Sequence, residues 1–262
     1  MGDARFGLTG ERRTATPELL GTVAIVGGGC YGTFYAGQLE RARARGAARY
    51  RRILVVDHDP ACRAARELPP DPARELVVAE WGDFFDQFLA RSHSDTDGLP
   101  DAIVPSPLMP HLMYEWLVRR ARLGWPGRVV ESRPVEEPLG TPYDRLAADG
   151  TRYVSFADWT CPVHCIEPST CPMIDAPRTW EMSDALSDLV RRLNRSRRAE
   201  GPVLFVCRHR VYGVGMFDAG AALAGARLLA DAGAGGEPVD VVVGTVSACH
   251  GALSVLHLGA RE

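Results

Sequence analysis

The chain has 262 residues, of which 46% are hydrophobic and 24% charged, and its net charge is −3. These proportions are typical of a globular protein, and the charge gives no electrostatic case for a nucleic-acid-binding surface. No apolar run approaches the roughly 20 residues that span a membrane, and residues 1–19 lack the apolar core of a secretory signal. We therefore expect a cytoplasmic protein without membrane insertion, preceded by a flexible tail over 1–19.

Every one of the 30 basic residues is arginine, since the sequence contains no lysine. Without lysine the protein cannot form a Schiff base, as lysine-dependent aldolases do, and it cannot use a P-loop lysine to reach a phosphate. Both classes of enzyme are excluded by composition alone.

The first half alternates short apolar strands with amphipathic helices. We expect strands at 22–26, 51–59, 75–83, 101–107 and 128–134, and helices at 33–47, 60–69, 83–92 and 111–124. This rhythm predicts an α/β fold with a doubly wound parallel sheet over residues 20–135.

The second half, residues 136–262, is less regular and predicts a smaller α/β portion. We expect strands at 153–159 and within 201–217 and 239–259, and helices at 179–198 and 218–236. Thr179 is the expected N-cap of the first of these helices. A cysteine-rich loop without hydrophobic periodicity, 155–180, precedes these two helices.

A glycine-rich loop follows the first predicted strand. Gly27, Gly29 and Gly32 form the pattern G-x-G-x-x-G between a strand and a helix. In such a loop the first glycine permits the tight turn, the second lets the backbone approach a pyrophosphate, and the third lets helix and strand pack closely. Asp57 ends the second strand, where a carboxylate binds the ribose hydroxyls and disfavours a 2′-phosphate.

The stretches TVAIVGGGCYG and ILVVDHD resemble the Rossmann-type NAD(P)-binding superfamily. The resemblance implies that NAD is the cofactor, with NADP less favoured, and that Asp83 after the third strand contacts the adenosine side. S-adenosylmethionine, FAD and a loop without a ligand remain alternatives.

Cys161, Cys165 and Cys171 lie in the stretch CPVHCIEPSTCP with spacing C-x3-C-x5-C. Clustered cysteines in a chain without an export signal favour metal binding or catalysis over disulfides. Structural zinc usually takes two close cysteine pairs, whereas three local thiolates and a remote ligand suit a [4Fe–4S] cluster. CPVHCI also resembles the C-P-V-x-C-I stretch of bacterial ferredoxins, in which both cysteines bind iron. Zinc and the absence of any metal remain alternatives.

The fourth ligand is expected from the ends of two later strands. Cys207 and His209 follow one strand, and Cys249 and His250 follow another. Because parallel strands place their carboxyl ends at one edge of a sheet, these residues are expected to meet. We predict Cys207 and Cys249 as ligands and His209 and His250 as proton carriers.

Two residues inside the cysteine-rich stretch are further candidates. Glu167, beside Cys165, is a candidate acid or base or a candidate ligand, and His164 is a candidate ligand or proton carrier.

Together these patterns predict an enzyme, an NAD-linked oxidoreductase with a cysteine-ligated centre acting on a small molecule that the sequence does not identify. One alternative is a non-enzymatic redox or metal sensor, since the first half also resembles the nucleotide-binding regulators of potassium uptake systems. A metal-handling protein such as a chelatase is another. A homodimer stays open, because a cluster can be shared between chains.

Overall fold

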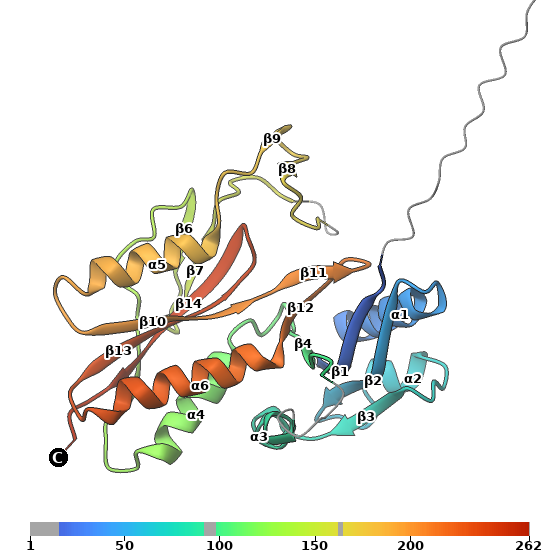
Figure 1. Ribbon diagram of the computed structural model, residues 1–262, viewed down its shortest axis with the longest axis horizontal. Helices are drawn as coiled ribbons and strands as arrows, with labels where there is room; N and C mark the ends of the chain where they lie inside the picture. The colour runs from blue at the N-terminus through green and yellow to red at the C-terminus, as the bar shows by residue number, and fades with distance from the viewer. Residues whose placement is uncertain (1–15, 92–97, 162–164, 262) are drawn as a thin grey trace, which may run out of the picture.

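The computed structural model describes residues 16–91, 98–161 and 165–261, and it is a mixed α/β structure (Figure 1). Most of the predicted tail and His164 lie outside these ranges. The helices are α1 (Cys30–Ala44), α2 (Arg63–Glu67), α3 (Trp81–Arg91), α4 (Leu112–Gly124), α5 (Met182–Leu193) and α6 (Ala219–Ala234).

The strands of the first half are β1 (Glu18–Val26), β2 (Ala48–Asp57), β3 (Arg74–Val78), β4 (Ala102–Val104) and β5 (Val130–Arg133). Those of the second half are β6 (Tyr143–Leu146), β7 (Arg152–Ser155), β8 (Thr170–Cys171), β9 (Ala176–Pro177), β10 (Ala199–Val206), β11 (Arg208–Val211), β12 (Val214–Asp218), β13 (Val239–Val246) and β14 (His250–Leu258).

The first sheet has the strand order β11-β12-β4-β1-β2-β3. Strands β1 to β4 are mutually parallel, whereas β12 pairs antiparallel with β4 through Phe217 opposite Ile103. The buried side chains of β1 alternate between two cores, because Val23 and Ile25 pack with α1 while Ala24 and Val26 pack with α3. Helices therefore cover both faces of this sheet.

The second sheet has the order β10-β13-β14-β7-β6, and β5 also pairs with β14. Strands β10 and β13 are parallel, and β13 and β14 form an antiparallel hairpin. Val241 and Val243 pack in one core with α4 and α6, whereas Val242 and Val246 pack in another with α5. Figure 1 shows α5 on one side of this sheet and α4 and α6 on the other.

Three local expectations were wrong. The predicted strand 128–134 does not join the parallel sheet, because β5 hydrogen-bonds antiparallel to β14. The region predicted as one strand and a loop within 201–217 forms β10 in the second sheet and the hairpin β11–β12 in the first. Helix α5 has Glu181 rather than Thr179 at its N-cap, and no side chain caps it.

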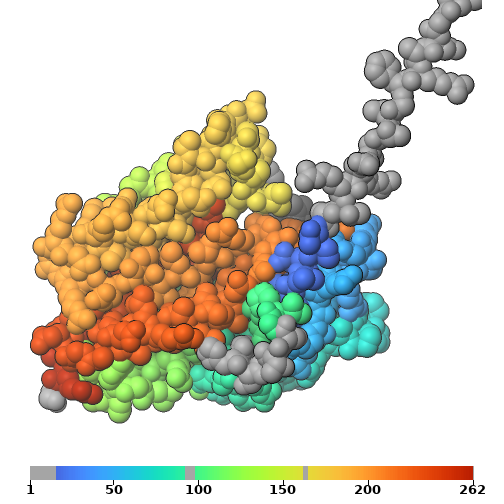
Figure 2. Space-filling view, in the orientation of Figure 1, coloured from blue at the N-terminus to red at the C-terminus, as the bar shows by residue number. Residues whose placement is uncertain are grey.

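The two sheets are built from both halves of the chain. Strand β12 adds to the sheet of the first half, and β5 adds to the sheet of the second. One hydrophobic core runs from Ala24 in β1 through Phe217 in β12 to Val243 in β13. Segments on both sides of residue 135 thus hydrogen-bond and pack together. The segment from β8 to β9 projects from this body as a ridge, drawn in yellow (Figure 2).

Candidate functional site

The carboxyl ends of β10 and β13 lie side by side, as expected for parallel neighbours. Val206 is opposite Val246, and the N–H of Cys207 donates a 2.7 Å hydrogen bond to the Val246 carbonyl. The chain after β13 turns back through Ser247 to Cys249 and enters β14 at His250. The two predicted Cys/His pairs are therefore brought to the same edge of the second sheet.

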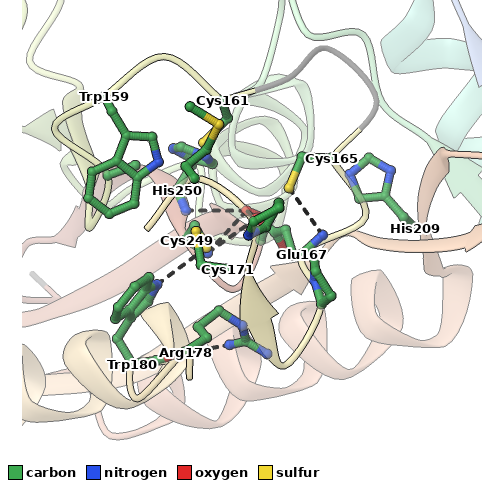
Figure 3. A pocket seen from close by; sticks show the side chains of 15 residues that line it. Trp159, Cys161, Cys165, Glu167, Cys171, Arg178, Trp180, His209, Cys249 and His250 are labelled. Carbon is green, nitrogen blue, oxygen red and sulfur yellow. Dashed lines mark hydrogen bonds between the residues drawn. The ribbon is translucent and has the colours of Figure 1, made fainter. Parts of the chain in front are cut away.

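Four thiols line one cavity at this edge. Cys161, Cys165 and Cys171 come from the cysteine-rich loop, and Cys249 comes from the β13–β14 turn (Figure 3). The cavity, which we call the thiol cavity, has a volume of about 200 Å³, and His209 and His250 also line it. Each of the seven cysteines of the chain has a free thiol.

Glu167 holds the cysteine-rich loop against the β13–β14 turn. Its carboxylate accepts hydrogen bonds from the Ser247 hydroxyl at 2.5 Å, from the Ala248 N–H at 2.9 Å and from the Cys249 N–H at 3.3 Å. Its backbone has φ 52°, a left-handed conformation that is uncommon for glutamate and is found where surrounding contacts impose it. The structure thus gives Glu167, predicted as an acid or base, a positioning contact.

N–H groups point at the sulfurs of two cavity cysteines. The indole N–H of Trp180 donates to Sγ of Cys249 at 3.3 Å, and the backbone N–H of Glu167 donates to Sγ of Cys165 at 3.4 Å (Figure 3). N–H donors of this kind stabilise a thiolate or a sulfur-ligated metal by compensating its negative charge.

Two more N–H groups in the cavity wall have no acceptor among the residues that the structure describes. They are Nε1 of Trp159 and Nε of Arg178, both fully buried. The Trp159 indole N–H nevertheless lies close enough to the Cys161 thiol to lower the pKa of that thiol. Because a buried donor without a partner costs free energy, these groups are available to a ligand that accepts hydrogen bonds.

Burial sets the protonation of the cavity thiols. The pKa of Cys161 is raised by burial first, then by the nearby Cys165 and Cys171. Burial also raises the pKa of Cys249 to about 11. The hydrogen bond from the Trp180 N–H has the smaller, opposite effect on this pKa. In the protein alone these two thiols are protonated at neutral pH, and a bound metal would have to displace their protons.

The two histidines at the edge differ in their surroundings. The Nδ1–H of His209 donates to the Gly213 carbonyl at 2.8 Å, which fixes the orientation of this ring. Burial lowers the pKa of His250, and the Glu167 carboxylate acts in the opposite direction. A neutral His250 at the cavity wall is able to accept a proton.

Cys207 does not line the thiol cavity. It continues the alternation of Val203 and Phe205 and packs on the face of the second sheet that α4 and α6 cover. Burial raises the pKa of its thiol to about 12. Of the two strand-end cysteines predicted as ligands, only Cys249 lies with the loop cysteines.

The cavity side chains do not close around one point. Over residues 16–91, 98–161 and 165–261, no three His, Cys, Asp or Glu side chains are placed to hold a single metal ion. The donors match a sulfur-ligated centre in number and chemistry, since four thiols are the usual ligand set of a [4Fe–4S] cluster. Binding such a centre would require the loop thiols to converge further.

A second cavity, of about 480 Å³, lies between the two sheets, and we call it the inter-sheet cavity. Its walls include Tyr35 of α1, the segment 105–107 after β4, and Thr245 near the end of β13. It shares His209, Ser247 and His250 with the thiol cavity. The two cavities therefore adjoin across the edge of the second sheet.

The glycine-rich loop sits where β1 ends and α1 begins. Gly27 has φ 83°, a Cβ on Gly32 would lie 1.8 Å from the Gly27 carbonyl oxygen, and a Cβ on Gly29 would meet nothing within 4 Å. The loop thus turns tightly, brings helix and strand into contact, and leaves open space beside its central glycine.

The two predicted carboxylates differ in position. Oδ2 of Asp57 accepts the N–H of Gly28 at 2.7 Å, so this carboxylate lies against the glycine-rich loop. Asp83, in the first turn of α3, pairs with Arg119 of α4 at 2.6 Å and is 61% exposed. Asp83 therefore forms an ion pair between two helices at the surface, and its partner does not belong to the glycine-rich loop.

Several residues of the site escape sequence reasoning. Trp159, Arg178, Trp180, Thr245 and Ser247 line the two cavities. Trp180 falls in a predicted helix, whereas in the structure it lies in the irregular segment between β9 and α5. The two tryptophans that flank the cysteine stretch are the one local signal, because indole N–H groups are frequent donors to buried acceptors.

Comparison with protein families places this site in a recurring domain. Residues 113–259, more than half of the chain, match the AF_1314_C family model, described as "Uncharacterized protein, C-terminal domain". The protein belongs to this family. The AF_1314_C domain contains the second sheet and all four thiols of the thiol cavity, whereas the glycine-rich loop precedes it. No curated protein and no solved structure matches the chain.

No helix in the described parts of the chain has both the length and the apolar character needed to cross a membrane.

Proposed function

We propose that the protein is an NAD-dependent oxidoreductase whose thiol cavity holds an iron–sulfur cluster. The observation that carries the proposal is that Cys161, Cys165, Cys171 and Cys249 line one cavity, and that N–H groups donate to two of these sulfurs. Thiols supply the ligands of such clusters, and N–H donors stabilise their negative charge.

The first sheet supports the dinucleotide part of the proposal. Its parallel strands run in the order β3-β2-β1-β4, and the glycine-rich loop lies at the carboxyl end of β1. A Rossmann-like sheet binds a dinucleotide at this place, with the pyrophosphate at the N-terminus of the following helix. Asp57 then lies beside the adenosine ribose, which favours NAD over NADP.

Each residue of the site has a distinct task in this proposal. A bound cluster would supply a Lewis-acidic site that positions the substrate, while the nicotinamide carries a hydride. Trp180 orients and stabilises Cys249, and Glu167 keeps the cysteine-rich loop on the β13–β14 turn. His250, neutral and at the wall of both cavities, accepts or returns a proton during turnover.

Metal analysis of protein prepared without oxygen tests the cluster. We expect bound iron and acid-labile sulfide, and loss of both in Cys161→Ser, Cys171→Ser and Cys249→Ser. Cys30→Ser is the matched control, because Cys30 is exposed in the glycine-rich loop and does not line the cavity. Iron that survives all three cavity substitutions would contradict the proposal.

Binding of NADH, followed by its fluorescence, tests the dinucleotide site. We expect NADH to bind more tightly than NADPH. Displacement of the bound dinucleotide by S-adenosylmethionine at equal concentration would overturn this assignment.

A metal-handling protein is the second candidate. It is favoured by the placement of the cavity donors, which are grouped but not closed around one ion in the described residues. Such a protein would take up zinc or iron and release it to an added chelator within seconds to minutes, whereas a resident cluster would be retained.

A further inference from the structure

The inter-sheet cavity is large enough for a small organic molecule and is distinct from the thiol cavity. Its volume of about 480 Å³ falls in the range of ligand pockets. It is lined by Thr245 and Ala252, which are paired across the β13–β14 hairpin, and by Tyr35 of α1. The cavity is thus formed by elements of both sheets.

The residues that line this cavity include no aspartate, glutamate or arginine among the described residues. Burial raises the pKa values of Tyr35 and Tyr153, so these two phenols stay neutral near pH 7. A charged ligand would lose its hydration here without gaining a counter-ion, which is costly.

One polar atom in the cavity lacks a partner. Oγ1 of Thr245 is fully buried and forms no hydrogen bond with any described residue. Thr245 is 9% exposed and lies two positions after Val243, on the same face of β13 as the cavity. A hydroxyl in this position is able to donate to a carbonyl oxygen of a ligand, which would relieve the cost of its burial.

The rest of the lining is largely apolar. Tyrosine rings and the prolines 105, 107 and 110 line the cavity. Faces of this kind pack well against a planar ring, and ring stacking adds stabilisation beyond the buried area.

We propose that the inter-sheet cavity binds the substrate, an uncharged ring compound whose carbonyl oxygen accepts a hydrogen bond from Thr245. The substrate would lie against His209 and His250, the residues that also line the thiol cavity. Naming this ligand the substrate rests on the proposed function. The binding site itself does not, because it involves neither the cysteines of the thiol cavity nor the glycine-rich loop.

The test compares two probes of the same shape, acetophenone and benzoate, with the full chain free of metal and dinucleotide. Dissociation constants are measured by NMR titration. We expect acetophenone to bind at least about tenfold more tightly than benzoate, because only benzoate brings a charge into the cavity. Thr245→Val should weaken acetophenone binding by about tenfold through loss of the hydrogen bond, and Ala252→Leu should abolish it by filling the cavity.

Thr22→Val is the matched control, since Thr22 is equally a buried strand threonine but lines a different cavity. Acetophenone binding that is unchanged in both Thr245→Val and Ala252→Leu would place the site elsewhere and overturn the inference, as would equal or tighter binding of benzoate. Loss of iron or of NADH binding would count against the proposed function and leave this result unaffected.

Discussion

The backbone N–H of Cys249 donates a 3.3 Å hydrogen bond to Oε1 of Glu167, although the two residues are 82 positions apart. The same carboxylate accepts from the Ser247 hydroxyl and the Ala248 N–H. One side chain of the cysteine-rich loop thereby fixes the turn that carries the fourth thiol. The geometry of the thiol cavity depends on this contact.

Glu167→Ala is expected to lower the free energy of unfolding by about 1–3 kcal/mol, because it leaves partly buried N–H groups of the turn without an acceptor. Urea unfolding measures the loss, and iron content should fall with it. Glu115→Ala is the control, since Glu115 is exposed on α4 and should change stability by less than about 0.5 kcal/mol. Equal stability of the two variants would show that the contact does not hold the loop.

Gly29→Asp should abolish NADH binding with little effect on folding, because a side chain at this position meets open space and the charge repels phosphate. Gly32→Ala should instead destabilise the protein by about 3 kcal/mol, since its Cβ would overlap the Gly27 carbonyl. Thermal unfolding and NADH fluorescence separate the two effects. Gly37→Asp, on the same helix and also in open space, serves as the control and should leave NADH binding intact.

Thr245→Val is expected to stabilise the ligand-free protein by about 1 kcal/mol, because it replaces a buried hydroxyl without a partner by a methyl group of similar size. Denaturant unfolding checks the sign. A variant that is more stable but binds acetophenone less well would have the behaviour of a binding residue. A destabilised variant would mean that the hydroxyl is satisfied in the folded protein.

Cys207 should resist alkylation at pH 8, because burial raises the pKa of its thiol to about 12 and only the thiolate reacts. Its labelling rate should rise as the pH approaches 12. The exposed Cys30 provides the internal comparison and should be labelled first. Mass spectrometry after brief treatment with iodoacetamide measures the extent of labelling at both cysteines. If Cys207 is labelled as fast as Cys30 at pH 8, the prediction is wrong.

Trp180→Phe should make the reduction potential of the bound cluster more negative, because it removes the N–H donated to Cys249 while a ring remains to stack on Phe156. Trp125→Phe is the control, since Trp125 follows α4 and lines neither cavity. Redox titration of the two purified variants compares their potentials. A potential that shifts equally in both variants would contradict a specific role of the Trp180 N–H.

The features that the sequence predicted well depend on local patterns. The pattern of Gly27, Gly29 and Gly32 spans the end of β1 and the first turn of α1 as expected, because a strand, a tight turn and a helix each leave a short-range signature. The alternation of strands and helices likewise gave the parallel strands β1 to β4. The three loop cysteines are close in sequence, so their proximity required no knowledge of the fold.

Pairing between distant strands had to come from the tertiary structure. The periodicity of 128–134 is that of a strand, but it does not say whether the partner is β4 or β14, since hydrogen-bonding groups are the same in every strand. For the same reason the sequence could not predict that β12 adds antiparallel to β4 in the first sheet.

The choice between Cys207 and Cys249 was also decided by the tertiary structure. Both follow a strand, and sequence alone treats them alike. Strand alternation turns Cys207 toward the core beneath α6, whereas the hairpin between β13 and β14 carries Cys249 around the edge to the loop thiols. The sequence therefore determined which chemical groups are available, and the pairing of β10, β13 and β14 determined which of them meet, because side-chain direction in a sheet depends on register.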